Sequence, residues 1–197
     1  MLPFLLQAVE SVGHTVFTKG KFNLNIVGIR NNRPVPNEFD DLICVVYKDE
    51  YDQWITNSWP ATTDPGMYYL NNPMNVTGTA IMMPGQYRGS YKIGMHYTYE
   101  ALVQHGGTVR IWRDSNKDDI LDYGIEDQSE GYFGINIHRA HADINTDTVD
   151  RWSAGCQVFQ KPEDFDEFMN LCYKAAEIWG NGFTYTLIVP NKFLMEA

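Results

Sequence analysis

The sequence has little cysteine, few basic residues and no long apolar run. Its 197 residues include only three cysteines, which excludes the disulfide framework typical of small secreted domains. No stretch of about twenty consecutive apolar residues is present, which excludes a membrane-spanning helix. Lysine and arginine number 15 against 25 acidic residues, and the formal net charge is −10. Because such a surface repels phosphate backbones, we predict no nucleic-acid partner.

What the sequence does contain favours strands and turns. Aromatic residues make up 14% of the chain, together with 16 glycines and 9 prolines. One convincing helix is predicted at 162–179, where apolar residues recur at helical spacing between an acidic start and a glycine. We therefore predict a mainly β fold with α, a sandwich or barrel with one main C-terminal helix packed alongside. Short apolar or alternating runs predict its strands at 22–26, 42–47, 53–59, 79–83, 87–93, 109–112, 133–138, 157–159 and 183–189, with 99–104 as a strand or a short helix.

The start of the chain is apolar but short. Residues 1–9 lack a basic leading region and a small-residue cleavage site, so they do not predict a classical signal peptide. We predict an N-terminal helical extension over residues 1–20, followed by one domain over residues 21–197.

One of the three cysteines stands in a context suited to chemistry. Cys44 lies in an apolar run and Cys172 in an amphipathic helical pattern, so both are expected to be buried. Cys156 follows Gly155, which allows the sharp backbone turn that displays a thiol. A strand that ends on His138 offers an imidazole that can take the thiol proton. The alternative from these residues alone is a half-buried loop cysteine and a surface histidine.

The spacing of these residues resembles a known family. His138 is followed by 14 intervening residues and then by Ser153-Ala154-Gly155-Cys156. This arrangement is similar to the signature of the L,D-transpeptidase (YkuD-type) catalytic domain, which pairs a histidine with a downstream Ser/Thr-x-Gly-Cys. The segment 84–94, punctuated by proline and glycine, also resembles the part of that family before its catalytic half. The resemblance covers about residues 40–190 and implies a β-rich catalytic domain.

The sequence also departs from the family pattern. The family usually has histidine at the position of Ala154 and arginine or asparagine at that of Val158. Gln157 stands next to the cysteine instead, and Arg139 could supply the missing positive group. These changes leave open which peptide bond is attacked and whether the acceptor is water or an amine.

The resemblance implies acyl transfer from peptidoglycan stem peptides through a thioester on the cysteine, with no cofactor required for catalysis. Hydrolysis, as in an endolysin, and L,D-transpeptidation are both open outcomes. Without an export signal, we expect cytoplasmic synthesis with release to the cell wall, or a virion-associated enzyme of a bacteriophage. The predicted catalytic residues are Cys156, His138, Ser153 near the imidazole, and Gly155 beside an oxyanion site; the predicted substrate contacts are Arg139, Trp152, Gln157 and His96.

An acidic segment partly matches a calcium-binding loop. Oxygen-bearing side chains stand at positions 1, 3, 5 and 9 of the template, as Asp114, Asn116, Asp118 and Asp122. The template glycine is replaced by aspartate at 119, and Glu126 comes one residue late. The segment predicts either a structural calcium site or a solvated acidic turn.

Two further interpretations of the sequence stay open. His96, His105, His138 and His141 raise the alternative of a catalytic zinc, although their spacing matches no zinc motif. In a different class, an acidic, aromatic-rich β domain braced by calcium could be a non-enzymatic structural or adhesion module of a virion or surface assembly. In that case Cys156 would be buried and unreactive.

Overall fold

The computed structural model describes residues 1–124 and 128–190. Eight strands form a closed barrel in the order β1-β11-β5-β6-β9-β10-β3-β2. Their bounds are β1 (Asn25–Ile29), β2 (Asp41–Lys48), β3 (Trp54–Thr62), β5 (Gly85–His96), β6 (Tyr99–Gln104), β9 (Ile137–Arg139), β10 (Gln157–Phe159) and β11 (Phe183–Ile188).

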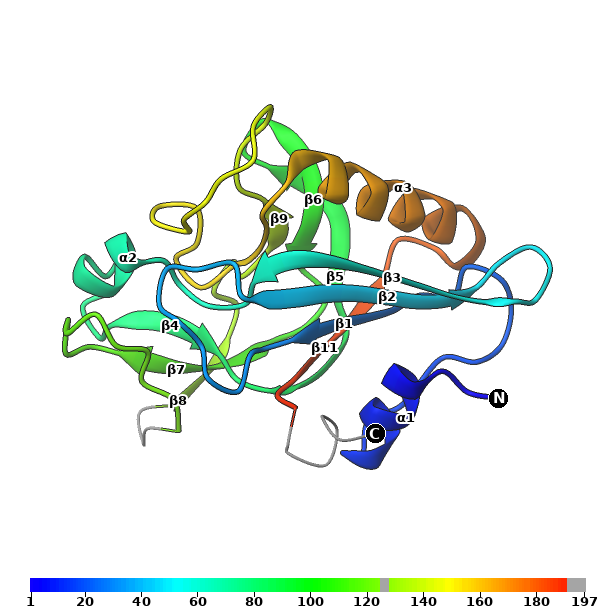
Figure 1. Ribbon diagram of the computed structural model, residues 1–197, viewed down its shortest axis with the longest axis horizontal. Helices are drawn as coiled ribbons and strands as arrows, with labels where there is room; N and C mark the ends of the chain where they lie inside the picture. The colour runs from blue at the N-terminus through cyan, green and yellow to red at the C-terminus, as the bar shows by residue number, and fades with distance from the viewer. Residues whose placement is uncertain (125–127, 191–197) are drawn as a thin grey trace.

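The barrel interior is filled by alternate residues of these strands, as the two-residue period of a strand requires. In β2, Ile43, Val45 and Tyr47 belong to the main core cluster. The helix α3 (Pro162–Trp179) adds Phe165 and Phe168 to the same cluster. Figure 1 shows α3 lying along the barrel close to β6 and β9.

A second sheet stands beside the barrel in the order β4-β7-β8. It consists of β4 (Thr79–Met82), β7 (Val109–Asp114) and β8 (Gln128–Gly131). The short helix α2 (Met67–Asn71) packs on this sheet, because Leu70 of the helix lies in one cluster with Ile81 and Leu121. Figure 1 places this sheet and α2 at one end of the molecule.

The N-terminal segment is helical only in part. The helix α1 covers Phe4–Ser11, whereas we predicted a helical extension over residues 1–20. Val9 packs against Val27 and Ile188, so the helix lies on the outside of β1 and β11. The chain then runs without helix or strand to Lys21, which forms an isolated bridge with Lys48.

The predicted fold class is confirmed: the chain is mainly β, with one main helix near its C-terminal end. Residues 99–104 form a strand rather than a helix. Strand β3 continues through Pro60 to Thr62, where we expected it to end. Proline is tolerated there because its ring sits in a two-stranded part of the ladder, and β10 pairs only with Ala61 and Thr62. Among the described helices, none has the length and apolarity needed to cross a membrane.

Candidate active site

Residues 153–156, which we call the nucleophile loop after the predicted role of Cys156, form a sharp turn immediately before β10. Gly155 has φ +120°, a conformation that L side chains rarely adopt, and a Cβ at this position would lie 2.5 Å from the carbonyl oxygen of Ala80. Only glycine therefore allows the loop to approach β4 this closely. The hydroxyl of Ser153 accepts a hydrogen bond from the Gly155 N–H at 3.1 Å and donates one to the Cys156 carbonyl at 2.8 Å. These bonds hold the turn that presents Cys156.

Strand pairing brings the histidine next to this loop. Strands β9 and β10 are parallel, with Ile137 opposite Gln157 and His138 opposite Val158. Cys156, one residue before this ladder, therefore lies beside Asn136, whose N–H points to its sulfur at 3.4 Å. The thiol itself donates to the Gly134 carbonyl at 3.6 Å. Strand pairing thus places the predicted nucleophile and base in neighbouring segments of the barrel.

A main-chain carbonyl orients the imidazole. Nδ1 of His138 lies 2.8 Å from the carbonyl oxygen of Arg139. Because a carbonyl only accepts, Nδ1 carries the hydrogen and Nε2 keeps a lone pair. The hydroxyl of Tyr99 donates to the same carbonyl at 3.3 Å. We expected Ser153 in this neighbourhood, but its hydroxyl is committed to the nucleophile loop instead.

A second histidine packs on the first. The rings of His96 and His138 are stacked, with centroids 4.1 Å apart and an angle of 20° between them. Nδ1 of His96 lies 3.0 Å from the amide nitrogen of Asn136. Asn136 thus contacts His96 with its side chain and Cys156 with its main chain. Sequence reasoning missed Asn136, although it stands two residues before His138 and strand periodicity places both on one face.

Burial keeps both His138 and Cys156 uncharged at neutral pH. It lowers the pKa of His138 to about 3, and the neighbouring His96 lowers it further, against the opposing effect of the Arg139 carbonyl. Burial raises the pKa of the Cys156 thiol to about 11, while the Asn136 N–H acts in the opposite direction. At neutral pH the site therefore holds a thiol and an uncharged imidazole, which is the form that can act as a base.

Cys156 and His138 line the same pocket, whose volume is about 830 Å³. Three of the predicted substrate contacts, His96, Arg139 and Trp152, also line it. The pocket lies where the barrel meets the second sheet, because Thr79 and Ala80 of β4 form part of its wall. It is therefore bounded by segments that lie far apart in the sequence.

Gln157 lies behind the nucleophile loop, contrary to our expectation that it contacts substrate. Its side chain is 0% exposed. Oε1 accepts a hydrogen bond from the Tyr185 hydroxyl at 2.8 Å, and Nε2 donates to the carbonyls of Gly155 at 3.3 Å and Thr63 at 3.4 Å. Gln157 thus braces the loop from within the barrel. The position of Gln157 as the first residue of a buried strand, β10, could have indicated this role from the sequence.

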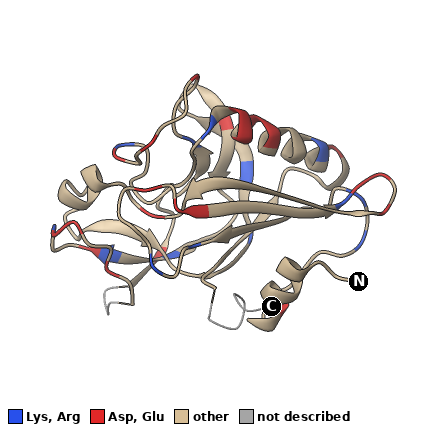
Figure 2. Cartoon of the chain, in the orientation of Figure 1, with Lys and Arg blue, Asp and Glu red and all other residues tan. Residues whose placement is uncertain are grey.

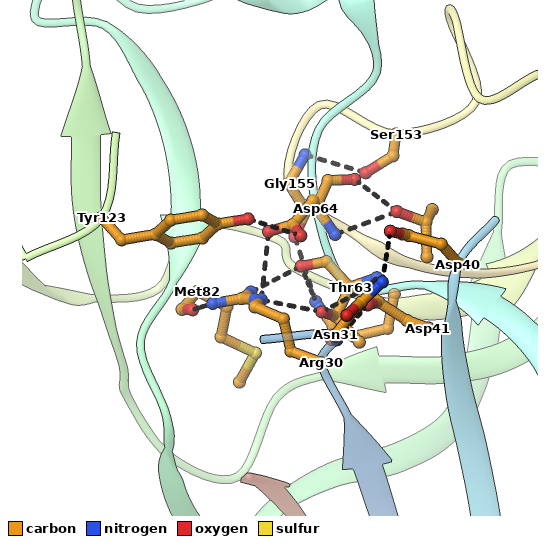
Figure 3. Close-up of polar contacts among 12 residues, drawn as sticks. Arg30, Asn31, Asp40, Asp41, Thr63, Asp64, Met82, Tyr123, Ser153 and Gly155 are labelled. Carbon is orange, nitrogen blue, oxygen red and sulfur yellow. Dashed lines mark hydrogen bonds and ion pairs between the residues drawn. The ribbon is translucent and has the colours of Figure 1, made fainter. Parts of the chain in front are cut away.

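The Thr63 carbonyl, which accepts from Gln157, belongs to a buried polar network around Arg30, and Figure 3 shows that network. Arg30 is 2% exposed and forms an ion pair with Asp64 at 3.1 Å. Its other nitrogens donate to the carbonyls of Thr63 and Met82, both at 2.8 Å. The Thr63 carbonyl accepts from Arg30 and from Gln157, so the network is connected to the nucleophile loop.

Two buried carboxyls complete this network. Asp41 accepts hydrogen bonds from the N–H and hydroxyl of Thr63, and burial followed by the nearby Asp64 raises its pKa to about 7. Burial also raises the pKa of Asp64, which Arg30 and the Tyr123 hydroxyl act to lower. Among the residues labelled in Figure 3, only Arg30 supplies a full positive charge.

The predicted calcium loop is held by its own hydrogen bonds. The amide nitrogen of Asn116 donates to Asp118 at 3.0 Å and to Asp122 at 2.8 Å, and Asp114 accepts from the Asp122 N–H at 3.2 Å. Ile125 and Glu126, at the end of the template, lie outside the described residues. In residues 1–124 and 128–190, no group of three or more histidine, cysteine or acidic residues is arranged to hold a metal ion. The calcium site stays a prediction, and a melting temperature that calcium and a chelator leave unchanged would contradict it.

Three of the four histidines considered for zinc, His96, His138 and His141, make other contacts. His96 and His138 stack on one another, and His141 packs edge-on against Trp152. Nδ1 of His141 accepts the N–H of Asp143 at 3.0 Å.

The chain matches no protein-family model, no curated protein and no solved structure. The resemblance to the L,D-transpeptidases therefore depends on the residues of the chain itself.

Proposed function

We propose that the protein is a cysteine-dependent acyl-transfer enzyme that acts on peptidoglycan stem peptides. The observation that carries this proposal is the shared pocket of Cys156 and His138, with Nδ1 of the imidazole tied to the Arg139 carbonyl. This arrangement fixes the tautomer that a base needs. The other two cysteines are buried, at 3% exposure for Cys44 and 0% for Cys172, so neither competes as nucleophile.

The first step is proton transfer coupled to attack. Nε2 of His138 takes the thiol proton of Cys156 as the sulfur attacks the peptide carbonyl carbon. Because both groups are neutral at rest, the negative charge develops only as the new C–S bond forms. The Asn136 N–H stabilises the partial negative charge that the sulfur carries as its proton leaves and the C–S bond forms.

The main chain of the nucleophile loop offers one donor for the oxyanion. We expected the N–H groups of Gly155 and Cys156 to serve together, but the Gly155 N–H already donates to the Ser153 hydroxyl. The Cys156 N–H has no acceptor in the part of the chain that the structure describes, so it is the donor we assign. Ser153 thus supports catalysis by holding the loop rather than by contacting the reacting atoms.

The second half of the reaction releases the acyl group. The His138 imidazolium protonates the departing amine, and water or an amine then attacks the thioester. Attack by water gives a cleaved stem peptide, and attack by an amine gives a cross-link. We favour hydrolysis, because a lysis or virion enzyme would need cleavage, and the volume of about 830 Å³ accommodates several peptide residues.

Mass analysis of muropeptides tests the proposal. Purified sacculi are incubated with the native protein, with Cys156→Ala, and with Cys172→Ala as the matched control for loss of a cysteine. Cleaved stem peptides are expected with the native protein and the control, and none with Cys156→Ala. Cross-linked dimers in place of cleaved stems would make the hydrolase version wrong. Identical products from all three proteins would remove peptidoglycan as substrate.

Thiol labelling separates this proposal from a non-enzymatic structural module. Iodoacetamide at neutral pH is expected to modify Cys156 faster than Cys44 or Cys172, because only Cys156 lines the pocket. Replacing His138 with glutamine removes the base and is expected to slow the modification. Equal, slow labelling of all three cysteines would support the structural module.

A further inference from the structure

The pocket around Cys156 has a charge opposite to that of the protein. The whole chain has 25 acidic and 15 basic residues. Among the described residues that line the pocket, three are arginines, Arg113, Arg139 and Arg151, and none is aspartate or glutamate. Figure 2 shows acidic residues elsewhere in the chain, for example in the first turn of α3. A cleft with charge of one sign concentrates ligands of the opposite sign.

The arginines supply this positive charge. Burial lowers the pKa of both pocket histidines, His96 and His138, which keeps them uncharged at neutral pH. Arginine keeps its charge at every pH that proteins encounter. The pocket therefore attracts an anion regardless of the state of the catalytic pair.

Two of the arginines are partly committed to protein groups. Arg139 lies 3.6 Å from Asp166 and stacks over Tyr99. Arg113 is buried and donates to the Gly78 carbonyl at 3.1 Å. These contacts use part of their hydrogen-bonding capacity before a ligand arrives.

Arg151 is the arginine best placed to bind a ligand. It is exposed, and its guanidinium lies 3.8 Å from the ring centroid of Tyr68 on α2. Stacking fixes the guanidinium plane while its N–H edge stays available for a planar acceptor. It makes no ion pair within the described part of the chain.

The backbone around Arg151 is held firmly. A Cβ at Gly66 would lie 2.2 Å from the Asp150 carbonyl oxygen, so the start of α2 packs directly on the residue before Arg151. The Gly66 N–H also donates to the Ser153 carbonyl at 2.9 Å. One contact network thus fixes both Arg151 and the nucleophile loop, and this sets their relative position.

We propose that Arg151 binds a free carboxylate of the substrate, so that the pocket selects acidic peptides over their amidated forms. A carboxylate can accept two parallel hydrogen bonds from one guanidinium, which a neutral amide cannot do. The proposal rests on the proposed function for the identity of the substrate, but the binding preference can be measured without any reaction. We expect a preference on the order of 10- to 100-fold for the acidic peptide, as charged hydrogen bonds commonly give.

Calorimetry on the Cys156→Ala protein tests this binding. The probes are N-acetyl-alanyl-glutamyl-lysyl-alanine with free carboxyl groups, whose two carboxylates outnumber its one ammonium group, and the same peptide with every carboxyl amidated. The acidic peptide is expected to bind 10- to 100-fold more tightly, and Arg151→Gln in the same background is expected to abolish the difference. Arg88→Gln is the matched control, because Arg88 is exposed on β5 and does not line the pocket. Arg151→Lys keeps the charge without the planar fork and is expected to retain part of the preference.

The outcomes separate this inference from the proposed function. Equal affinities for the two peptides, no binding of the acidic peptide at millimolar concentration, or a preference that survives Arg151→Gln would each overturn the inference. A thioester on Cys156, sought by mass spectrometry on the native protein, tests the acyl-transfer proposal independently. If the preference depends on Arg151 but no thioester forms with the acidic peptide, the carboxylate site stands and acyl transfer to Cys156 does not.

Discussion

Replacing Gly155 with alanine should destabilise the protein and displace Cys156, the proposed nucleophile. The backbone at this position has φ +120°, and holding an alanine in so sparsely populated a region costs about 1–3 kcal/mol. The new Cβ would also lie 2.5 Å from the Ala80 carbonyl oxygen, well inside the 3.4 Å at which ordinary contact begins. Ala80 is paired with Arg113 in the β4–β7 ladder, so its carbonyl cannot move freely. Relieving such overpacking costs about another 1–3 kcal/mol.

The expected total is therefore about 2–6 kcal/mol in the free energy of unfolding. Urea unfolding measures it directly, and the melting temperature should fall by roughly 2–4 °C per kcal/mol. Gly89→Ala is the matched control, because Gly89 has φ +61° with nothing within 4 Å of its Cβ position. That change should cost only about 1 kcal/mol, the penalty of the left-handed conformation alone. Equal losses in the two variants would refute the argument that the approach to Ala80 requires glycine.

Three further predictions concern buried ionisable groups. Because Cys156 is a thiol at neutral pH, its alkylation rate should rise about tenfold per pH unit between pH 7 and 10; a plateau from pH 5 to 8 would indicate a resting thiolate instead. In the unfolded chain His138 is protonated below its ordinary pKa of 6.5, whereas in the folded chain it is protonated only near pH 3. This histidine therefore contributes stability that is fully present above pH 6.5 and is lost as the pH falls. Relative to His138→Gln, the unfolding free energy of the native protein should therefore decrease by about 1.4 kcal/mol per pH unit on acidification from 6.5 towards 3, and parallel pH profiles of the two proteins would contradict this. Arg30→Met should cost about 3–5 kcal/mol in urea unfolding by leaving Asp64 buried without its cation, and adding Asp64→Leu should recover part of this loss; a single variant as stable as the native protein would contradict the ion pair.

Local patterns in the sequence predicted most of the fold. The apolar runs of β2 and β11 and the helical spacing of α3 are signals carried by neighbouring residues, and each element formed within a few residues of its expected bounds. The barrel order could not be predicted in this way. Strand β1 pairs with β11 from the other end of the chain, and only the pairing of distant strands determines that neighbour.

The same distinction between local signals and distant contacts applies to the residues of the candidate site. The nucleophile, its preceding glycine and the histidine stand in a recognisable spacing, so the sequence alone could indicate them. Arg30 could not be found, because its partners Thr63 and Asp64 lie more than thirty residues away and nothing local marks a buried arginine. The role of Gln157, in contrast, had a local signal that our prediction did not use. Its neighbour Cys156 faces the pocket, and the next residue of a strand points the opposite way.

Under the proposed resemblance to the L,D-transpeptidases, the departure at residue 158 removes no charge from the pocket. L,D-transpeptidases usually have arginine or asparagine at the position of Val158, but here this residue is 0% exposed in β10 and does not line the pocket. An arginine there would be enclosed between β9 and β3 and would need a buried carboxylate to balance it. The chain instead places Arg139 and Arg151 on the pocket wall, and both lie between His138 and Cys156 in the sequence. If these arginines replace the family's charged residue, Val158→Arg should destabilise the protein without increasing its affinity for acidic peptides, which urea unfolding and calorimetry can test together.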